Sequence, residues 1–127
     1  MKSGRRAPCI HSVGGLCLDA FWANTGALVL LEVIGPAERT GSAPYPIATV
    51  RVERVLAHGA SPWCEALPEL RVALAVPLER GRRALAVLVP VNMTPGVLLT
   101  DAVDAETNEH ELVTQLRHAI AQRQAEM

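Results

Sequence analysis

The chain has 127 residues, of which 50% are hydrophobic and 20% charged, and its 12 basic and 13 acidic residues leave a formal net charge of -1. This length suits one domain with one hydrophobic core, and the apolar content is too high for a disordered chain. The near-neutral charge argues against a direct nucleic-acid partner. The longest apolar stretch, Ala84 to Val91, is too short to span a bilayer, and no secretory signal pattern follows Arg6, so we expect a cytoplasmic protein with no membrane partner.

The first predicted elements form a β-hairpin. Leu16 to Trp22 has a strand pattern, Asn24-Thr25-Gly26 has the residue types of a tight turn, and Ala27 to Ile34 is a second apolar strand. Gly35 to Pro46 follows with three prolines and two glycines, which predicts an exposed loop.

Residues 47–58 fit two different elements. Val50 and Val52 alternate with charged residues as in a strand, whereas Val52, Val55 and Leu56 share one face of a helix. The glycine that follows this segment is the common residue just past a helix end. We therefore favour a helix, with the strand as the open alternative.

The clearest predicted pair consists of the strands Leu70 to Leu78 and Arg83 to Val91, after a short strand candidate at Trp63 to Leu67. Gly81 allows a positive φ in the turn that would join the pair. Apolar side chains alternate onto both faces of the two strands. A hairpin of this kind is expected in the middle of a sheet, covered on each side.

A long amphipathic helix is predicted from Asn108 onward. Leu112, Leu116 and Ile120 lie on one apolar stripe, and acidic residues near the start suit the helix dipole. The stripe would pack on the sheet or on a second copy of the chain. We name these three residues as a predicted homodimer interface.

The cysteines and histidines predict no metal site and no cofactor. Cys9, Cys17 and Cys64 are odd in number and have no CxxC spacing, so we expect free thiols, with a redox sensor as the functional alternative. His110 and His118 are eight positions apart, whereas helical metal ligands are separated by four, so solvated histidines are expected.

Two segments resemble a known family. The run RVLAHGASPWCEALPELRVALAVPLERGRRALAVLVPV is similar to the second half of GAF sensory domains, in which a helix ending in a small-x-Gly turn precedes a short strand and an "alAvPL-turn-vlGvLvl" hairpin. The stretch LTDAVDAETNEHELVTQLRHAIA is similar to the closing helix of that family. Ala86 replaces the usual glycine, and the usual first helix is reduced or missing. These motifs describe packing and turns and contain no catalytic group.

The resemblance implies an α+β fold in which helices pack on a central antiparallel sheet of about five to six strands, formed by one domain over residues 1–127. It implies a non-catalytic module for small-molecule sensing, signalling or dimerisation. Its partners would be a small-molecule effector and, in addition, either a second copy of this chain or a signalling protein. Effector domains of IclR-type regulators are similar over Ala75 to Leu88. The predicted ligand-binding residues are Trp22, Tyr45, Trp63 and Cys64.

Two other classes of protein remain as alternatives. In an all-β OB-like structural or interaction domain, Pro46 to Leu56 would be a strand that pairs with Ala27 to Ile34. A cysteine-dependent methionine sulfoxide reductase, which is also GAF-like, would need a resolving thiol near Cys64. Because Cys9 and Cys17 lie far upstream in the sequence, an enzyme is not expected.

Overall fold

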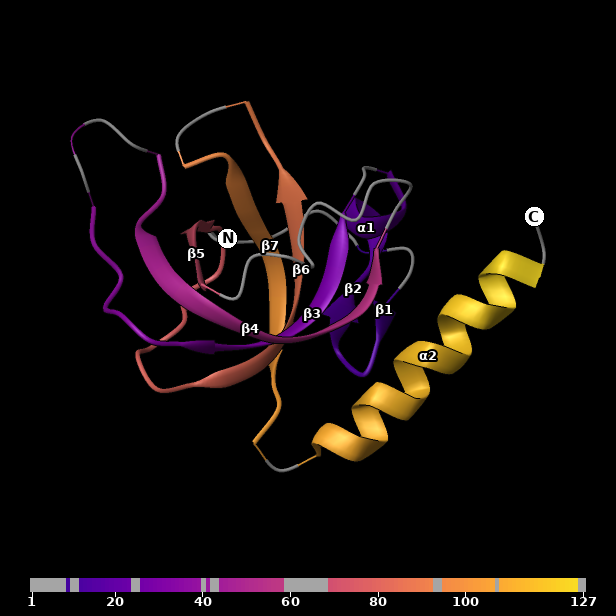
Figure 1. The fold of residues 1–127 in the computed structure, drawn as a ribbon. Helices are drawn as coiled ribbons and strands as arrows, with labels where there is room; N and C mark the ends of the chain where they lie inside the picture. Colours follow the sequence, from indigo (N-terminus) through magenta and orange to yellow (C-terminus); the bar gives the residue numbers. More distant parts are fainter. Residues whose placement is uncertain are drawn as a thin grey trace, which may run out of the picture.

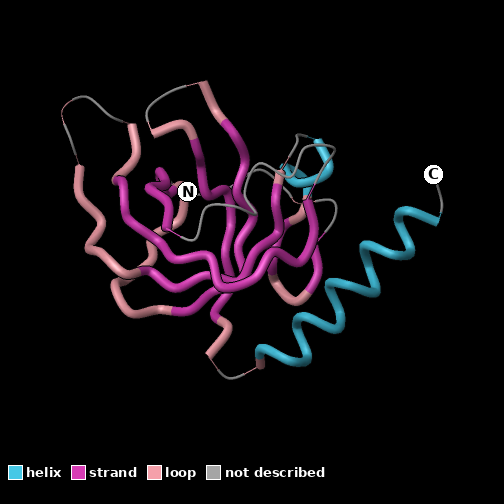
Figure 2. Tube along the Cα trace, viewed as in Figure 1, coloured by secondary structure: helices cyan, strands magenta, loops and turns pink. Residues whose placement is uncertain are grey.

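The computed structural model describes residues 9, 12–23, 26–39, 41, 44–58, 69–92, 95–106 and 108–125. Within them, seven strands and two helices follow in chain order: β1 (Ser12–Val13), β2 (Leu16–Cys17), α1 (Asp19–Ala23), β3 (Ala27–Val33), β4 (Ile47–His58), β5 (Glu69–Leu74), β6 (Arg83–Pro90), β7 (Val97–Asp104) and α2 (Glu109–Ala125). Figure 1 shows the longer strands curled around one another, with α2 running diagonally beside them. Figure 2 shows the same arrangement by type of secondary structure.

Five strands close into a barrel in the order β3-β4-β5-β7-β6, in which β6 also pairs with β3. Neighbouring strands are antiparallel except β5 and β7, which run parallel where Ala73 and Leu74 pair with Leu98 and Leu99. A five-stranded barrel is the architecture of OB-like domains.

The closed barrel shows that the predicted fold class is wrong. We expected a GAF-like α+β domain with helices packed on a central antiparallel sheet. The described residues instead form mostly strands, with a 5-residue α1 and a 17-residue α2. The apolar side chains that predicted a sheet covered by helices are instead buried inside the barrel, because the inner faces of all five strands line one enclosed core.

Residues 47–58 form the long strand β4, so the favoured helix is wrong and the OB-like alternative is correct about this segment. β4 pairs with β3, for example at Val33↔Val50, and the register shifts twice along the pair. Each shift adds one unpaired residue to β4, which changes the face of every side chain beyond it. Val52 and Val55 therefore both pack against the barrel core although they are three positions apart. These bulges produce the spacing that suggested a helix.

The predicted hairpin of residues 70–78 with 83–91 does not form. β5 pairs with β4 and β7, whereas β6 pairs with β3 and β7. The hairpin partner of β6 is β7, and the turn between them is closed by a hydrogen bond from Val91 N–H to Gly96 O at 3.0 Å. The expected burial of β6 on both faces is confirmed, since residues 84–89 are all buried. The pattern of apolar side chains therefore predicted the burial of β6 correctly, but not which strands pair with it.

The N-terminal segment also differs from the prediction. Leu16–Cys17 pairs with Ser12–Val13 around Gly14 and Gly15, whose φ angles of 59° and 88° suit a tight hairpin turn. The chain then enters α1, where Trp22 N–H donates to Leu18 O at 3.0 Å. The predicted strand from Leu16 to Trp22 is therefore wrong. The strand predicted at Trp63 to Leu67 lies outside the described residues.

Two apolar clusters stabilise this fold. The barrel interior is filled by small and branched side chains of β3 to β7, including Val29, Leu31, Val50, Val72, Leu88 and Leu99. An outer cluster on the opposite face of β3 and β6 contains Leu16, Leu18, Phe21, Leu28, Leu30, Leu85, Val87, Val113, Leu116 and Ile120. The N-terminal segment and α2 therefore cover one side of the barrel, which explains why β3 and β6 are apolar on both faces.

Candidate functional site

A groove between the outer side of β4 and one stripe of α2 is the candidate site. Its first hollow, of about 420 Å³, is lined by Arg54 of β4 and by five residues of α2: Glu109, His110, Val113, Thr114 and Arg117. Its second hollow, of about 440 Å³, is lined by Leu56, Ala57, His58, Arg117, Ile120, Ala121 and Gln124. Arg117 lines both hollows, so they adjoin at this residue along the helix. We call the two hollows together the β4–α2 groove.

Helical and strand periodicity place these side chains. His110, Thr114, Arg117 and Ala121 recur every three or four positions and so share one face of α2. The second half of β4 supplies the opposite wall. Val113 and Ile120 are buried at the base of this helical face, which makes the floor of the groove apolar.

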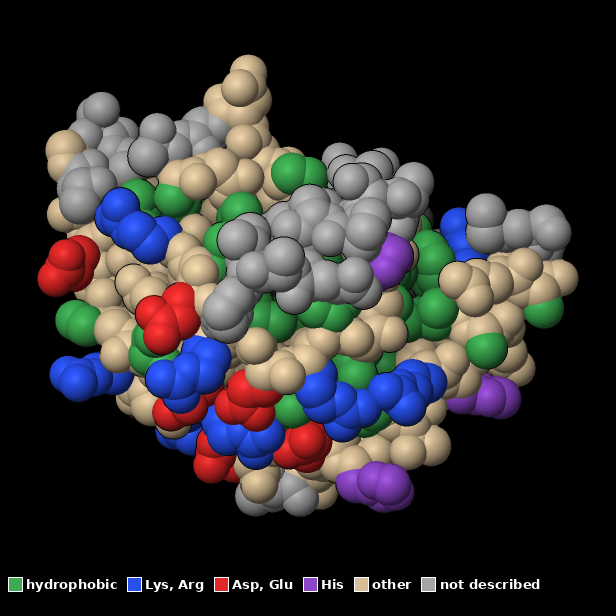
Figure 3. Space-filling view, in the orientation of Figure 1, with side chains coloured by type: hydrophobic (Ala, Val, Ile, Leu, Met, Phe, Trp, Pro, Cys, Tyr) green, Lys and Arg blue, Asp and Glu red, His purple; other side chains and the backbone are tan. Residues whose placement is uncertain are grey.

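The charges in the groove are mainly positive. Arg54 and Arg117 are both exposed, and neither forms an ion pair with any residue that the structure describes. Glu109, the one acidic lining residue, is already paired with Arg83 at 3.0 Å. Figure 3 shows Arg side chains beside Asp and Glu side chains on the lower part of the face of the molecule that is in view. Unpaired guanidinium groups beside an apolar floor can hold carboxylate or phosphate oxygens.

An ion cluster fixes the start of α2 to the barrel. The Arg83 guanidinium reaches Glu53 of β4 at 2.8 Å and Glu109 of α2 at 3.0 Å. The backbone N–H of Arg83 donates to Glu106 Oε1 at 3.3 Å. Hydrogen bonds to Glu53 and then Glu109 raise the pKa of Arg83 above its ordinary value. Glu109 also lies in the first turn of α2, where a negative charge is favourable. The cluster therefore sets the position of one wall of the groove.

The apolar stripe of α2 fixes the rest of that wall. Leu116 is 0% exposed and packs with Ile120 in the outer cluster, where Leu112 also packs. Leu112 lies so close to Gly14 that a Cβ on this glycine would overlap its Cδ2 methyl group. The three residues of the predicted dimer interface thus contact the chain's own core. The dimer itself stays a prediction.

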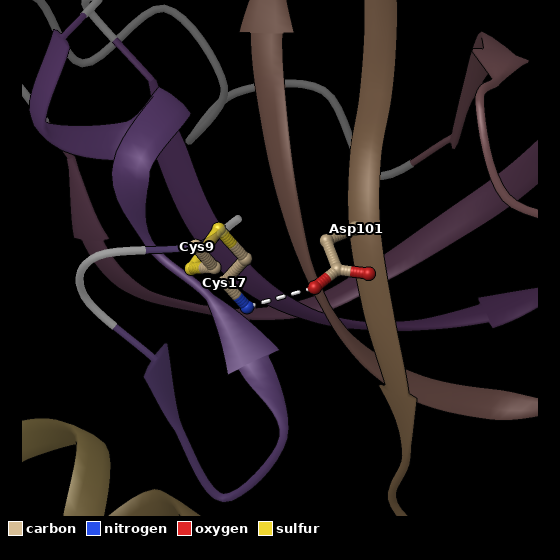
Figure 4. The surroundings of a disulfide bond; sticks show 3 residues. All are labelled: Cys9, Cys17 and Asp101. Atoms are coloured by element: carbon tan, nitrogen blue, oxygen red, sulfur yellow. Dashed lines mark hydrogen bonds between the residues drawn. A yellow bond between two sulfur atoms is a disulfide. The ribbon is translucent and has the colours of Figure 1, made fainter. Parts of the chain in front are cut away.

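A disulfide ties the N-terminal segment together, so the expectation of free thiols at both of its cysteines is wrong. Cys9 and Cys17 are bonded across a Cα–Cα distance of 5.9 Å. Figure 4 shows the bond next to Asp101 of β7, whose Oδ2 accepts a hydrogen bond from Cys17 N–H at 2.7 Å. Sequence reasoning missed both features. The only signal for Asp101 is a carboxylate within the largely apolar run of β7.

The predicted ligand residues do not assemble into one pocket. Trp22 lies on α1, packed edge-to-face against Phe21 with ring centroids 4.9 Å apart, and the Arg123 guanidinium lies 5.1 Å from its ring centroid. Tyr45 is half-buried in the loop that leads into β4. Because Ala27, just after α1, pairs with His58 at the end of β4, Trp22 and Tyr45 lie toward opposite ends of that strand. Trp63 and Cys64 lie outside the described residues.

The structure also bears on metal and membrane binding. Within the described ranges, one group of potential ligands gathers within 4.8 Å, namely Cys9, Cys17 and Asp19, but the disulfide leaves the two sulfurs without thiolate character. His110 lines the β4–α2 groove and His118 is exposed on α2. Across the part of the chain that is described, no helix has the length and apolar character needed to cross a membrane.

Comparison with known proteins identifies no relative: no protein-family model, curated protein or solved structure matches the chain. The comparisons therefore do not support the GAF resemblance, and the barrel replaces the sheet that the resemblance implied.

Proposed function

We propose that this protein is a non-catalytic binding module on an OB-like barrel, and that it holds an anionic ligand in the β4–α2 groove. The observation that carries the proposal is the position of Arg54 and Arg117, two arginines without ion-pair partners among the described residues, on facing walls above an apolar floor. Guanidinium groups bind carboxylates and phosphates through paired, charge-assisted hydrogen bonds. Leu56 and Ile120 would contact an apolar part of the same ligand.

The rigidity of the two walls also supports the proposal. One wall is a barrel strand, and the other is a helix held by the Arg83 ion cluster and by the buried side chains of Leu116 and Ile120. A preformed site loses less conformational entropy on binding than a mobile one. The small-molecule effector or signalling partner expected from the sequence would occupy this groove.

The disulfide supports an oxidising compartment in place of the expected cytoplasmic location. The Cys9–Cys17 bond joins an exposed cysteine to a half-buried one, within reach of cellular reductants. Disulfides persist in secreted, periplasmic or surface proteins and are rare where thiol systems keep cysteines reduced. We therefore propose that the protein works outside the reducing cytoplasm.

A titration followed by NMR tests the binding role. Backbone amide shifts of the ¹⁵N-labelled protein are recorded with citrate, a tricarboxylate, and with a capped hexaglutamate peptide. We expect saturable shifts along residues 54–58 and 110–124 with at least one of the two probes. Arg54→Glu and Arg117→Glu should each weaken binding about tenfold, the equivalent of about 1.4 kcal/mol.

The matched control is Arg80→Glu, an exposed arginine in the turn before β6 that does not line the groove. This variant should bind both probes with unchanged affinity. If neither probe shifts the groove amides, or if Arg80→Glu weakens binding as much as Arg117→Glu does, the proposal is wrong.

A further inference from the structure

We infer that the occupant of the β4–α2 groove is an extended acidic peptide segment of a partner protein, with an aliphatic side chain next to its carboxylates. This inference rests on the proposed function and names the class of partner. Three observations carry it: the length of the groove, the order of charged and apolar groups along it, and the absence of aromatic side chains from its described lining.

The groove is longer than a small anion. Its lining residues on α2 run from Glu109 to Gln124. At 1.5 Å per helical residue this stretch spans roughly 22 Å, which equals about six or seven residues of extended chain at about 3.3 Å each. A compact tricarboxylate would occupy only one of the two hollows. An extended peptide would occupy both and pass Arg117 where they meet.

Two arginines are followed along the groove by an apolar pair. Arg54 belongs to the first hollow, Arg117 is shared by both, and Leu56 and Ile120 line the second. A chain with acidic side chains opposite the arginines and one aliphatic side chain opposite Leu56 would be complementary to this order. Proteins that recognise extended peptides gain specificity from separate pockets for particular side chains.

A single-stranded nucleic acid, the other anionic polymer, fits less well. Nonspecific strand binding combines a positive groove with aromatic side chains on which bases stack. The described lining of both hollows contains no Trp, Tyr or Phe. The whole chain carries a formal net charge of -1, so it has no general attraction to a phosphate backbone.

Fluorescence anisotropy with the full chain tests the inference. The probe is a fluorescein-labelled, capped hexapeptide, Glu-Glu-Leu-Glu-Glu-Glu, and the competitors are citrate, the all-glutamate hexapeptide, a Lys-for-Glu peptide and an octathymidine strand. We expect the leucine peptide to bind at least tenfold more tightly than citrate, and the lysine peptide not to compete. Arg54→Glu and Arg117→Glu should each weaken the peptide at least tenfold, and Arg80→Glu less than twofold.

A second variant tests the aliphatic anchor. Leu56→Ala should weaken the leucine peptide several-fold while it leaves the all-glutamate peptide nearly unchanged. Because Leu56 also contacts the outer cluster, circular dichroism must first show that this variant is folded. If it is not, the leucine of the peptide is changed to alanine instead, and this peptide should bind the natural chain several-fold more weakly. Equal loss for both peptides in Leu56→Ala, or equal binding of the leucine and alanine peptides, would remove the anchor from the inference.

The outcomes separate this inference from the proposed function. If citrate binds as tightly as the peptide, the groove is a small-anion site, so the peptide inference is wrong and the proposed function stands. If octathymidine displaces the peptide at lower concentration, the partner is a nucleic acid and the inference is overturned. If no probe binds in a way that depends on Arg54 or Arg117, both proposals fail.

Discussion

The backbone N–H of Cys17 donates a hydrogen bond to the buried carboxylate of Asp101 at 2.7 Å, although the two residues are 84 positions apart in the sequence. This contact fastens the N-terminal hairpin to strand β7 beside the disulfide. Asp101 is 4% exposed and is the only buried charged side chain among the described residues. Leu16 and Leu18, on either side of Cys17, belong to the outer cluster against which α2 also packs.

Replacement of Asp101 is expected to destabilise the fold. Asp101→Ala leaves the Cys17 N–H without its acceptor in a half-buried place, which costs about 1–3 kcal/mol. Asp101→Asn keeps an acceptor oxygen and should cost less. Urea unfolding followed by circular dichroism measures both. Glu69→Ala, at an exposed carboxylate of β5, is the control and should cost about 0.5 kcal/mol or less. Equal losses at the two positions would contradict the role given to Asp101.

The disulfide is expected to stabilise the oxidised protein. Its ring closes over a sequence separation of 8, and closing a loop this short is worth roughly 2–3 kcal/mol in the chain-entropy description. Dithiothreitol should therefore lower the urea midpoint of the natural sequence to that of Cys9→Ser. It should not lower the midpoint of Cys9→Ser any further. Titration of thiols in unfolded, unreduced protein should find one per chain, whereas three would show that the bond is absent.

The ion cluster around Arg83 is expected to make a modest, salt-dependent contribution. Its side chain is 33% exposed, so solvent screens the pairs with Glu53 and Glu109, and Arg83→Gln should cost about 0.5–1.5 kcal/mol. Because the folded-state pKa of Arg83 is raised, the stability from its charge is present below the unfolded-state pKa and is lost only as the pH rises through the folded-state pKa. That range is strongly alkaline, so deprotonation of Arg83 should not alter stability near neutral pH.

The Arg83→Lys variant and added salt separate two contributions to stability, the hydrogen-bond geometry of Arg83 and its positive charge. Lysine keeps the positive charge but cannot form the two-pronged contact with Glu53, so it should restore only part of the loss. One molar salt should reduce the difference between Arg83 and Arg83→Gln. Arg82→Gln, which removes a looser 4.0 Å pair with Glu79, is the control and should leave the urea midpoint nearly unchanged.

Gly14 is expected to tolerate a side chain less well than another glycine of the same conformation. Gly14 and Gly41 have φ angles of 59° and 53°. Replacing either glycine by alanine should therefore cost a similar backbone strain energy, about 1 kcal/mol. Among the described residues, a Cβ at Gly41 would meet nothing within 4 Å, whereas at Gly14 it would overlap Leu112. Gly14→Ala should therefore cost about 0.5–1.5 kcal/mol more, the strain of moving Leu112 off its rotamer. If Gly14→Ala and Gly41→Ala have equal urea midpoints, Leu112 does not lie against Gly14, and α2 is farther from the N-terminal hairpin.

Several features of this protein could be predicted from the sequence because they depend on neighbours along the chain. Side-chain periodicity identified strand β3, the burial of β6 on both faces and the long helix α2. The prolines and glycines of residues 35–46 identified a connection that holds one isolated β-bridge, at Glu38. These properties follow from the alternation of side chains on a strand and from the 3.6-residue repeat of a helix.

Only the tertiary structure decided the strand partners and the candidate site. Alternation along β5 and β6 cannot specify that β5 runs parallel to β7, since a strand with the same faces can pair in several orders. The bulges of β4 depend on its pairing with β3, and without that partner the segment resembles a helix. Three features bring together residues that no local sequence pattern links: the Cys9–Cys17 disulfide, the hydrogen bond to Asp101, and the hollow that Arg54 and Arg117 both line. A barrel brings them together because closing its sheet fixes which outer faces become neighbours.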